Sequence, residues 1–82
     1  MDLTPSDVLT RHELTVLVEV ARGYRTAEIA RALRRSPKTV EKHRTNLQRK
    51  LGLRGVAQVT AYAILHRLVE PEDVLSADRP AA

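Results

Sequence analysis

Residues 36 to 52, which read SPKTVEKHRTNLQRKLG, constrain the fold most, because they carry the signals for both ends of one helix. Ser36 can accept a hydrogen bond from a free backbone N–H, and Pro37 has its φ angle preset for the first helical turn. Gly52 can adopt the left-handed conformation that ends many helices. The stretch therefore predicts a helix over residues 37–51.

The predicted helix 37–51 is amphipathic. At about 100° per residue, Val40, Leu47 and Leu51 share one stripe that suits a protein core. The opposite side carries polar residues: Lys38, Glu41, Lys42, Thr45 and Arg49. Long cations mixed with short hydrogen-bonding groups suit DNA, with phosphates at the edges and base edges in the middle. An ordinary solvated helix face has a similar composition, so both interpretations stay open on this helix alone.

The positive charge is concentrated in the middle of the chain. The whole sequence has a net charge of +4. Residues 22–54 hold eleven Lys and Arg against two acids, a balance of +9, and the remainder sums to −5 from three Arg and eight acids. Clustered cations favour a polyanionic partner, because phosphate contacts release counterions. A membrane surface would also attract them, but the helix 37–51 lacks the Trp or Phe of an interfacial helix, so no membrane partner is expected.

A capping box predicts a further helix near the N-terminus. Thr10 and Glu13 have the spacing at which each side chain bonds the backbone N–H of the other, and Leu9 is placed to staple onto Leu14. Apolar residues then repeat at helical spacing. We therefore expect a mostly buried helix over residues 11–22.

The run TAEIARAL predicts a short helix over residues 26–33. Only Arg34 and Arg35 separate this helix from the cap at Ser36. Two helices joined by so short a turn form the helix-turn-helix pattern, although the Gly that often lies in this turn is missing.

A fourth helix is predicted over residues 55–68, with Gly55 as its N-cap and Gln58 in the capping-box position. It is apolar on more than one side, and its surplus apolar residues include Ala57, Ala61 and Ile64. The surplus indicates either a partner surface or simply good helix-forming residues, and both explanations stay open. Outside the helices we expect an N-terminal leader over residues 1–9 and a flexible, acidic, Pro-containing tail over residues 71–82.

Length and composition exclude several classes of protein. Eighty-two residues make one small domain, and with only two aromatic residues its core must be aliphatic, which favours an all-α fold. The sequence has no Cys, and it has no apolar run near the roughly 20 residues that span a bilayer. Met1 is followed by Asp2 rather than by a targeting leader, so we expect a cytoplasmic protein.

Metal binding and catalysis lack support in the sequence. The histidines have no carboxylate or Cys companions at ligand spacing: His12, His43 and His66. The candidate nucleophiles fall at a terminus, a cap and a tail: Ser6, Ser36 and Ser76. We therefore expect no enzyme, no metal and no cofactor.

From Leu9 to Val69 the chain resembles the LuxR-type (GerE-like) helix-turn-helix domain of bacterial transcription regulators. The resemblance rests on LTRHELTVL, TAEIARAL, SPKTVEKHRTNLQRKLG and AYAILHRLV, which stand in the order and spacing of the four helices of that domain. It implies an all-α, four-helix DNA-binding domain over residues 10–70. Members of this family, response regulators among them, commonly carry a regulatory domain ahead of this one.

The resemblance also implies which residues meet DNA. The third helix of this family lies in the major groove, and its base-facing positions match Glu41, Lys42 and Thr45. Further positions match sites that touch phosphates or support the helix: Thr39, His43, Asn46 and Lys50. Lys38 and Arg49 of the outer stripe complete the predicted DNA-binding surface. The fourth helix of the family commonly supplies a dimer contact, which here falls on its surplus apolar residues.

Arg44 is expected to have a structural role. It lies beside the buried stripe of the helix 37–51, where it can either snorkel, with its aliphatic part on the core and its guanidinium in solvent, or pair with Glu13 or Glu28. We therefore place it outside the predicted DNA-binding surface.

The sequence departs from the family pattern at four positions. Arg11 stands where Pro is usual, Arg25 where a capping Ser is common, and Arg67 where a C-cap Gly is common. A left-handed conformation at Arg67 would cost about 1 kcal/mol. Glu41 at a base-facing position repels phosphates but can accept a hydrogen bond from cytosine, which should change the preferred site.

The expected partners are double-stranded DNA and a second copy of the chain, with RNA polymerase as a further candidate. The alternative to a LuxR-type regulator is a protein-interaction module like region four of sigma factors, which shares the helix order and contacts polymerase. The operator sequence, the sign of regulation and the controlling signal do not follow from the sequence.

Overall fold

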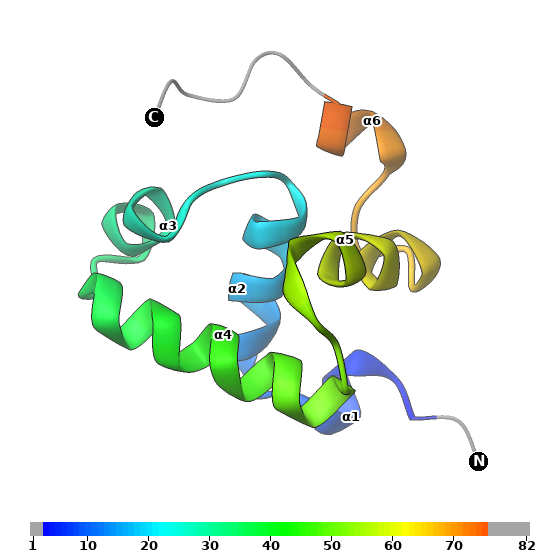
Figure 1. Cartoon of the computed structure of the whole chain (residues 1–82), viewed down its shortest axis with the longest axis horizontal. Coiled ribbons are helices and arrows are strands. Elements are labelled where there is room, and N and C mark those ends of the chain that lie inside the picture. The colour runs from blue at the N-terminus through cyan, green and yellow to red at the C-terminus, as the bar shows by residue number, and fades with distance from the viewer. Residues whose placement is uncertain (1–2, 76–82) are drawn as a thin grey trace.

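The computed structural model describes residues 3–75, and every regular element within that range is a helix (Figure 1). The six helices are α1 (Pro5–Val8), α2 (Arg11–Ala21), α3 (Thr26–Leu33), α4 (Pro37–Leu51), α5 (Gly55–Leu65) and α6 (Pro71–Leu75). The predicted all-α class is confirmed, and the four predicted helices correspond to α2 through α5.

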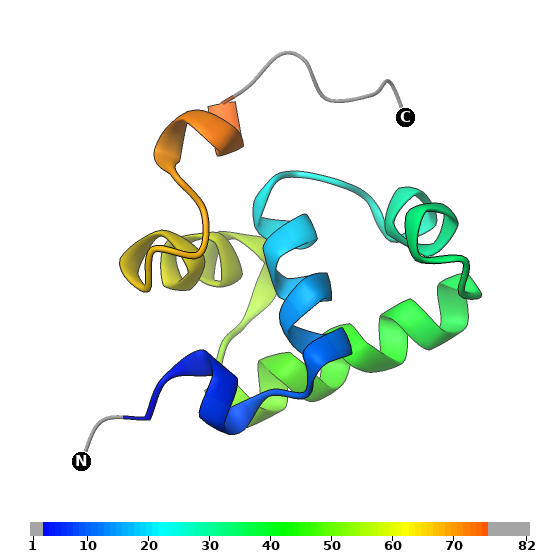
Figure 2. The ribbon, with the colours of Figure 1, turned by 180° about the vertical axis from the view of Figure 1, so that it is seen from behind.

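The other helices pack around α2, whose apolar residues form the centre of the core. α2 contacts α1, α3, α4 and α5, and α3 also contacts α4. Figure 2 shows α2 in the middle, with α5 on one side, α3 on the other and α4 running below it. Val16, Leu17 and Val20 of α2 are buried. Aliphatic residues from the rest of the chain complete the core: Leu9, Ile29, Ala30, Val40, Leu47, Val59, Ala63 and Val69.

Capping residues fix the start of α2 and both ends of α4, as predicted. Thr10 Oγ1 accepts a hydrogen bond from Glu13 N–H at 3.1 Å, and Glu13 Oε1 accepts one from Thr10 N–H at 3.0 Å. Ser36 Oγ accepts a hydrogen bond from Thr39 N–H at 3.1 Å. α4 ends at Gly52, whose φ of 66° is left-handed. The length and register of α4 are therefore set by local signals.

The turn between α3 and α4 forms without a glycine. Arg34 takes the left-handed conformation at the C-cap of α3, with φ 56° and ψ 44°. Arg35 N–H then donates to the carbonyl oxygen of Ala30 at 2.9 Å, which satisfies an acceptor at the end of the helix. A left-handed non-glycine residue costs roughly 1–2 kcal/mol, so the packing of α3 on α4 has to offset this strain.

α5 is shorter than predicted at its C-terminal end. It ends at Leu65 instead of residue 68, because Arg67 takes a left-handed φ of 57°. Leu68 N–H donates to the carbonyl oxygen of Ala63 at 2.8 Å across this turn. Arg67 therefore occupies the left-handed position at which the family pattern prefers Gly.

The cap of α5 lies one residue earlier than predicted. Arg54 is the N-cap, and Gly55 is the first helical residue with φ 70°. The backbone N–H of Arg54 donates to the side-chain oxygen of Gln58 at 2.6 Å. The capping oxygen therefore lies four residues after the cap instead of three.

Short helices also form near both ends of the described range. α1 lies within the predicted leader over 1–9, and α6 lies within the predicted flexible tail over 71–82. In each, the N-cap backbone N–H donates to an aspartate three residues later: Thr4 to Asp7 at 2.8 Å and Glu70 to Asp73 at 3.1 Å. This local capping, absent from the expectation of a flexible tail, explains the helix at residues 71–75, while residues 76–82 lie outside the described range. None of the described helices is long and apolar enough to cross a membrane.

Candidate nucleic-acid interface

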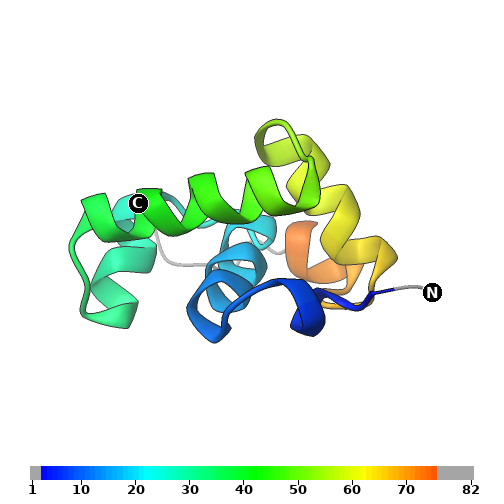
Figure 3. The same cartoon turned by 90° about the horizontal axis from the view of Figure 1, so that it is seen from below.

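α4 has one buried stripe and one exposed stripe, as its amphipathic pattern predicts. Val40 and Leu47 are only 0% and 1% exposed, since α4 packs against both α2 and α3. The side chains of the opposite stripe are exposed: Lys38, Glu41, Lys42, Thr45 and Arg49. Figure 3 shows α4 along one edge of the molecule, with α1, α2 and α3 on its inner side. The fold therefore leaves the polar stripe of α4 open to a partner.

A shallow hollow on the exposed side of α4 is lined by Glu41, Arg44, Thr45 and Gln48. Glu41, Thr45 and Gln48 share one stripe, because they are spaced four and three residues apart. Gln48 is half-buried and was not among the predicted site residues. Its position seven residues after Glu41, two helical turns, is the sequence signal that identifies it. Its amide can donate and accept hydrogen bonds, as adenine recognition in the major groove requires.

Lys50, which matches a family position that touches phosphates or supports the helix, contacts α2 in the structure. Its Nζ atom is 2.7 Å from Glu13 Oε1 of α2, and the Glu13 residue is only 3% exposed. This ion pair joins the last turn of α4 to the first turn of α2. A cation that already neutralises a buried carboxylate is poorly placed to neutralise a phosphate, so the geometry favours a structural role for Lys50.

Glu13 caps α2 and holds Lys50 with the same carboxylate. Burial raises the pKa of the Glu13 carboxyl group, but the hydrogen bonds from Lys50 and from the Thr10 backbone, together with the Lys50 charge, outweigh it. The net result is a pKa below the ordinary value of 4.5. The fold therefore stabilises the ionised form of Glu13.

Other predicted support residues of α4 contact neighbouring side chains. The imidazole rings of His43 and His12 of α2 stack with their centroids 5.6 Å apart and their planes at 16°. The oxygen of the Asn46 side-chain amide accepts a hydrogen bond from Arg49 Nη2 at 3.3 Å. The hydroxyl of Thr39 lies 2.9 Å from that of the cap residue Ser36. These contacts restrict the side chains that border the exposed stripe.

Arg44 reaches a hydroxyl of α3 instead of an acidic residue. Its Nη1 atom donates to Thr26 Oγ1 at 2.9 Å. Of the two alternatives for Arg44, the pairing with Glu13 or Glu28 does not form, because Glu13 pairs with Lys50 and Glu28 caps the start of α3. The contact links the two helices of the helix-turn-helix pair directly.

α5 exposes apolar side chains on the side away from α2. Leu65 is 77% exposed, Ala57 and Ala61 are exposed, and Ile64 is half-buried. Several of the surplus apolar residues of α5 therefore lie on the surface of the single chain.

The histidines do not share one site. Within residues 3–75, no group of three or more His, Cys, Asp or Glu side chains could hold a metal ion. His66 lies against Tyr62 of α5, with the ring centroids 4.1 Å apart, whereas His12 and His43 stack between α2 and α4.

Comparison with known proteins identifies the family. The model of the bacterial regulatory proteins of the luxR family matches residues 7–63, which hold α2, α3, α4 and most of α5. The oxygen regulatory protein NreC of Staphylococcus aureus strain JH9 is 41% identical over 66 residues, and NreC of strains JH1 and USA300 gives the same figures. These matches cover 80% of this chain but only 30% of each relative. No solved structure matches the chain significantly. Since the family match covers well over half of the sequence, the chain belongs to the luxR family of bacterial regulatory proteins, which are helix-turn-helix, DNA-binding transcription regulators.

Proposed function

We propose that this chain binds double-stranded DNA sequence-specifically, with α4 in the major groove. The observation that carries the proposal is the exposed polar stripe of α4, on a helix whose opposite stripe is buried at Val40 and Leu47 and half-buried at Leu51. Such a helix is held rigidly while its free side offers groups that bond base edges and phosphates. Membership of the luxR family supports the same assignment.

The exposed side chains of α4 divide into two groups. Lys38 and Arg49 lie near opposite ends of the helix, where long cations can reach phosphates on either side of the groove. Glu41, Lys42 and Thr45 lie between them and face the bases. A carboxylate accepts from the amino group of cytosine, and a threonine methyl packs against that of thymine. The preferred site should therefore contain a cytosine opposite Glu41.

The remaining residues of the predicted DNA-binding surface hold α4 in place. Lys50 does so through Glu13, and His43 through its stack on His12. Thr39 and Asn46 lie at the border of the exposed stripe, where contacts to neighbouring side chains leave them close to a bound backbone. We infer that these residues set the orientation of α4 on the duplex.

A gel-shift experiment on random duplexes tests the proposal. The protein should shift them at low salt and release them at high salt, and selection from a random library should enrich one sequence. Lys42→Glu should abolish the shift, whereas Arg67→Glu, with the same charge change beyond the end of α5, should retain it. Absence of any shift at low salt would contradict DNA binding, and a library without enrichment would contradict sequence specificity.

Other roles of the chain stay predictions. The match to the luxR family weakens the alternative of a module like region four of sigma factors. A contact with RNA polymerase is expected if the DNA-bound protein recruits polymerase. A cytoplasmic location is expected if the DNA target is bacterial. Oxygen regulation is a role that the name of the relative NreC gives, and the match with the present chain spans only 30% of that protein.

We also propose a weak homodimer through the outer face of α5. Ala57, Ala61 and Leu65 recur every four residues on this face, and all three are exposed. Small alanine side chains permit two such helices to approach closely. Because one short helix buries little area, we expect the dimer to form on DNA that carries two half-sites about one helical turn apart.

Sedimentation of the protein on two-site and one-site duplexes tests the dimer. The wild-type chain should fill two half-sites cooperatively. Ala61→Glu should remove this cooperativity through like-charge repulsion, while its affinity for a single half-site stays unchanged. Independent filling of the two half-sites by the wild-type chain would argue against the contact.

A further inference from the structure

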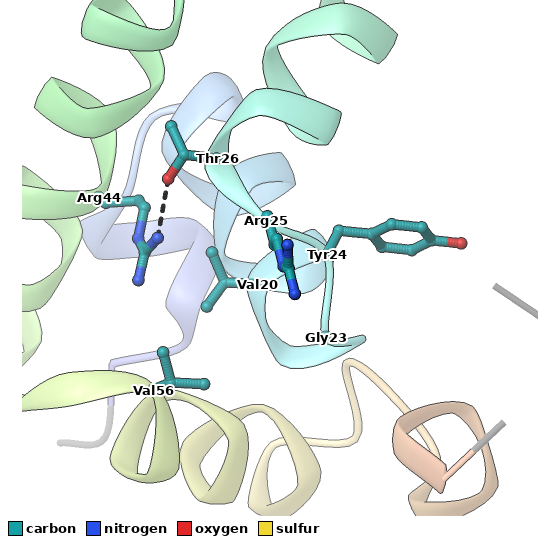
Figure 4. A pocket seen from close by; sticks show the side chains of 7 residues that line it. All are labelled: Val20, Gly23, Tyr24, Arg25, Thr26, Arg44 and Val56. Carbon is teal, nitrogen blue, oxygen red and sulfur yellow. Dashed lines mark hydrogen bonds between the residues drawn. The ribbon is translucent and has the colours of Figure 1, made fainter. Parts of the chain in front are cut away.

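A second hollow, of about 330 Å³, lies where the turn between α2 and α3 meets α4 and α5 (Figure 4). Its apolar lining includes Val20, which is 3% exposed, and Val56, which is 49% exposed. Its polar lining includes Thr26 and two arginines, Arg25 and Arg44. The hollow therefore combines an aliphatic wall with two guanidinium groups.

The two arginines carry uncompensated positive charge. None of the residues that line the hollow is acidic, and within residues 3–75 neither Arg25 nor Arg44 forms an ion pair. Figure 4 shows Val20 between the two guanidinium groups in that view, with the Arg44 bond to Thr26 drawn. That bond fixes Arg44 and leaves its other N–H donors for a ligand, since a guanidinium carries five donors. The hollow thus favours an anion that has an apolar portion.

Arg44 also connects this hollow with the exposed stripe of α4. It lines both the hollow at Val56 and the hollow formed by Glu41, Thr45 and Gln48. A duplex that places its bases on the hollow at Glu41, Thr45 and Gln48 therefore has a backbone strand close to the hollow at Val56. A phosphodiester has the required chemistry, because its charged oxygens suit arginines and its deoxyribose suits an aliphatic wall.

We propose that one backbone phosphate of the bound DNA lies between Arg25 and Arg44, with its deoxyribose against the exposed side chain of Val56. The inference rests on the proposed DNA binding and adds a phosphate site outside the outer stripe of α4. Arg44 then has two tasks, since it ties α4 to α3 and also binds the phosphate. Arg25, which replaces a common capping Ser, supplies the second guanidinium.

Three glutamine variants, together with Arg31→Gln as a control, test the site on a duplex selected from a random library. Arg25→Gln and Arg44→Gln should each weaken binding on the order of tenfold, as expected for loss of a charged hydrogen bond. The double variant should lower the slope of log affinity against log salt by about one unit, because one phosphate is involved, and not by two. Arg31→Gln removes the same charge about 140° round α3 from Thr26 and should change neither quantity.

Folding and DNA binding are separated by two controls. Thermal unfolding of each variant reports any loss of the Arg44 bond to Thr26. Arg25 has an exposed side chain, and its capping contact to Glu28 uses only the backbone N–H, so Arg25→Gln keeps the fold. If the wild-type chain binds no duplex, the proposed function fails. If it binds DNA but the double variant behaves like Arg31→Gln, the phosphate site alone is overturned.

A scan with neutral methylphosphonates identifies the phosphate. Replacing phosphates one at a time should reveal one position that weakens binding of the wild-type chain but has no further effect on the double variant. The Arg31→Gln protein should remain sensitive at that position. If every position that affects the wild-type chain still affects the double variant, no phosphate lies between Arg25 and Arg44, and the inference is wrong.

Discussion

α4 and α5 both pack against α2, but their exposed faces carry different kinds of side chain. Their inner faces are alike, since each places aliphatic side chains in the shared core. On their outer faces, α4 exposes charged and hydroxyl groups such as Glu41 and Thr45, whereas α5 exposes Ala61 and Leu65. The inner face of each helix is determined by the fold, whereas the outer faces differ in chemistry. This difference fits the proposed contacts, DNA for α4 and a second copy of the chain for α5.

The largest expected effect contrasts the same substitution on the two faces. Leu47→Ala removes a fully buried side chain of α4 and should lower the free energy of unfolding by about 2–5 kcal/mol, enough to unfold much of so small a domain. Leu65→Ala on the outer face of α5 should change it by less than about 0.5 kcal/mol. Urea unfolding followed by circular dichroism measures both. Similar losses in the two variants would show that Leu65 is part of the core.

The next effect concerns the ion pair between Lys50 of α4 and Glu13 of α2. Lys50→Met should lower the free energy of unfolding by roughly 2 kcal/mol, because the buried Glu13 carboxylate loses a charged hydrogen bond. DNA affinity should fall because less of the protein is folded, while the slope of log affinity against log salt stays unchanged. A slope lowered by about one unit would instead restore the phosphate contact that the sequence suggested for Lys50.

The same pair makes stability depend on acid pH. The pKa of Glu13 is lowered in the folded state, so its contribution is fully present above its unfolded value near 4.5 and is lost as pH falls through the folded pKa. Urea unfolding between pH 6 and about pH 3 should show this loss in the wild-type chain. Glu13→Gln should flatten the pH dependence, and an unchanged profile in that variant would assign the loss to other carboxyl groups.

Most of the fold follows from local sequence signals. The caps at Thr10, Ser36 and Gly52 and the apolar stripe of α4 were all visible in the sequence, because each depends on neighbours within a few residues. The contacts of Lys50 and Arg44 were not, since both cross between helices. Helical spacing tells which side a residue occupies, but a long flexible side chain at the border of a stripe can turn either way.

The helix ends also depend on features that the sequence pattern does not fully predict. Arg34 and Arg67 take left-handed conformations that the sequence marks only by the absence of the usual Gly. Gln48 shares the stripe of Glu41 by simple spacing, but only the hollow that it lines marks it as a site residue. Residue types at regular spacing thus predict which elements form, whereas the partner of each polar side chain requires the packed structure.

A smaller effect tests the reading face of α4 directly. Glu41→Gln removes a negative charge beside the DNA backbone, so affinity for random duplexes should rise. The preference for cytosine at the matching base pair should fall by about 1 kcal/mol, because glutamine favours adenine. Binding to a selected site and to its single-base variants measures both changes. If only the general affinity rises, Glu41 lies near phosphates and away from the bases.

The smallest expected effect decides which side of α4 enters the groove. Thr45 lies in the middle of the exposed stripe, where its hydroxyl and methyl can meet a base edge. Thr45→Ala should alter preference at one base pair by less than about 1 kcal/mol, since a lone hydroxyl contact is weaker than a bidentate pair. The salt slope should stay unchanged, because no charge is lost. Arg49→Gln, about one turn further along the helix and facing phosphates, provides the opposite result: a slope lower by about one unit at unaltered sequence preference. Salt titrations of both variants on the selected and a scrambled site distinguish the two roles, and an exchange of their signatures would mean that α4 docks with a different edge of its exposed face toward the bases.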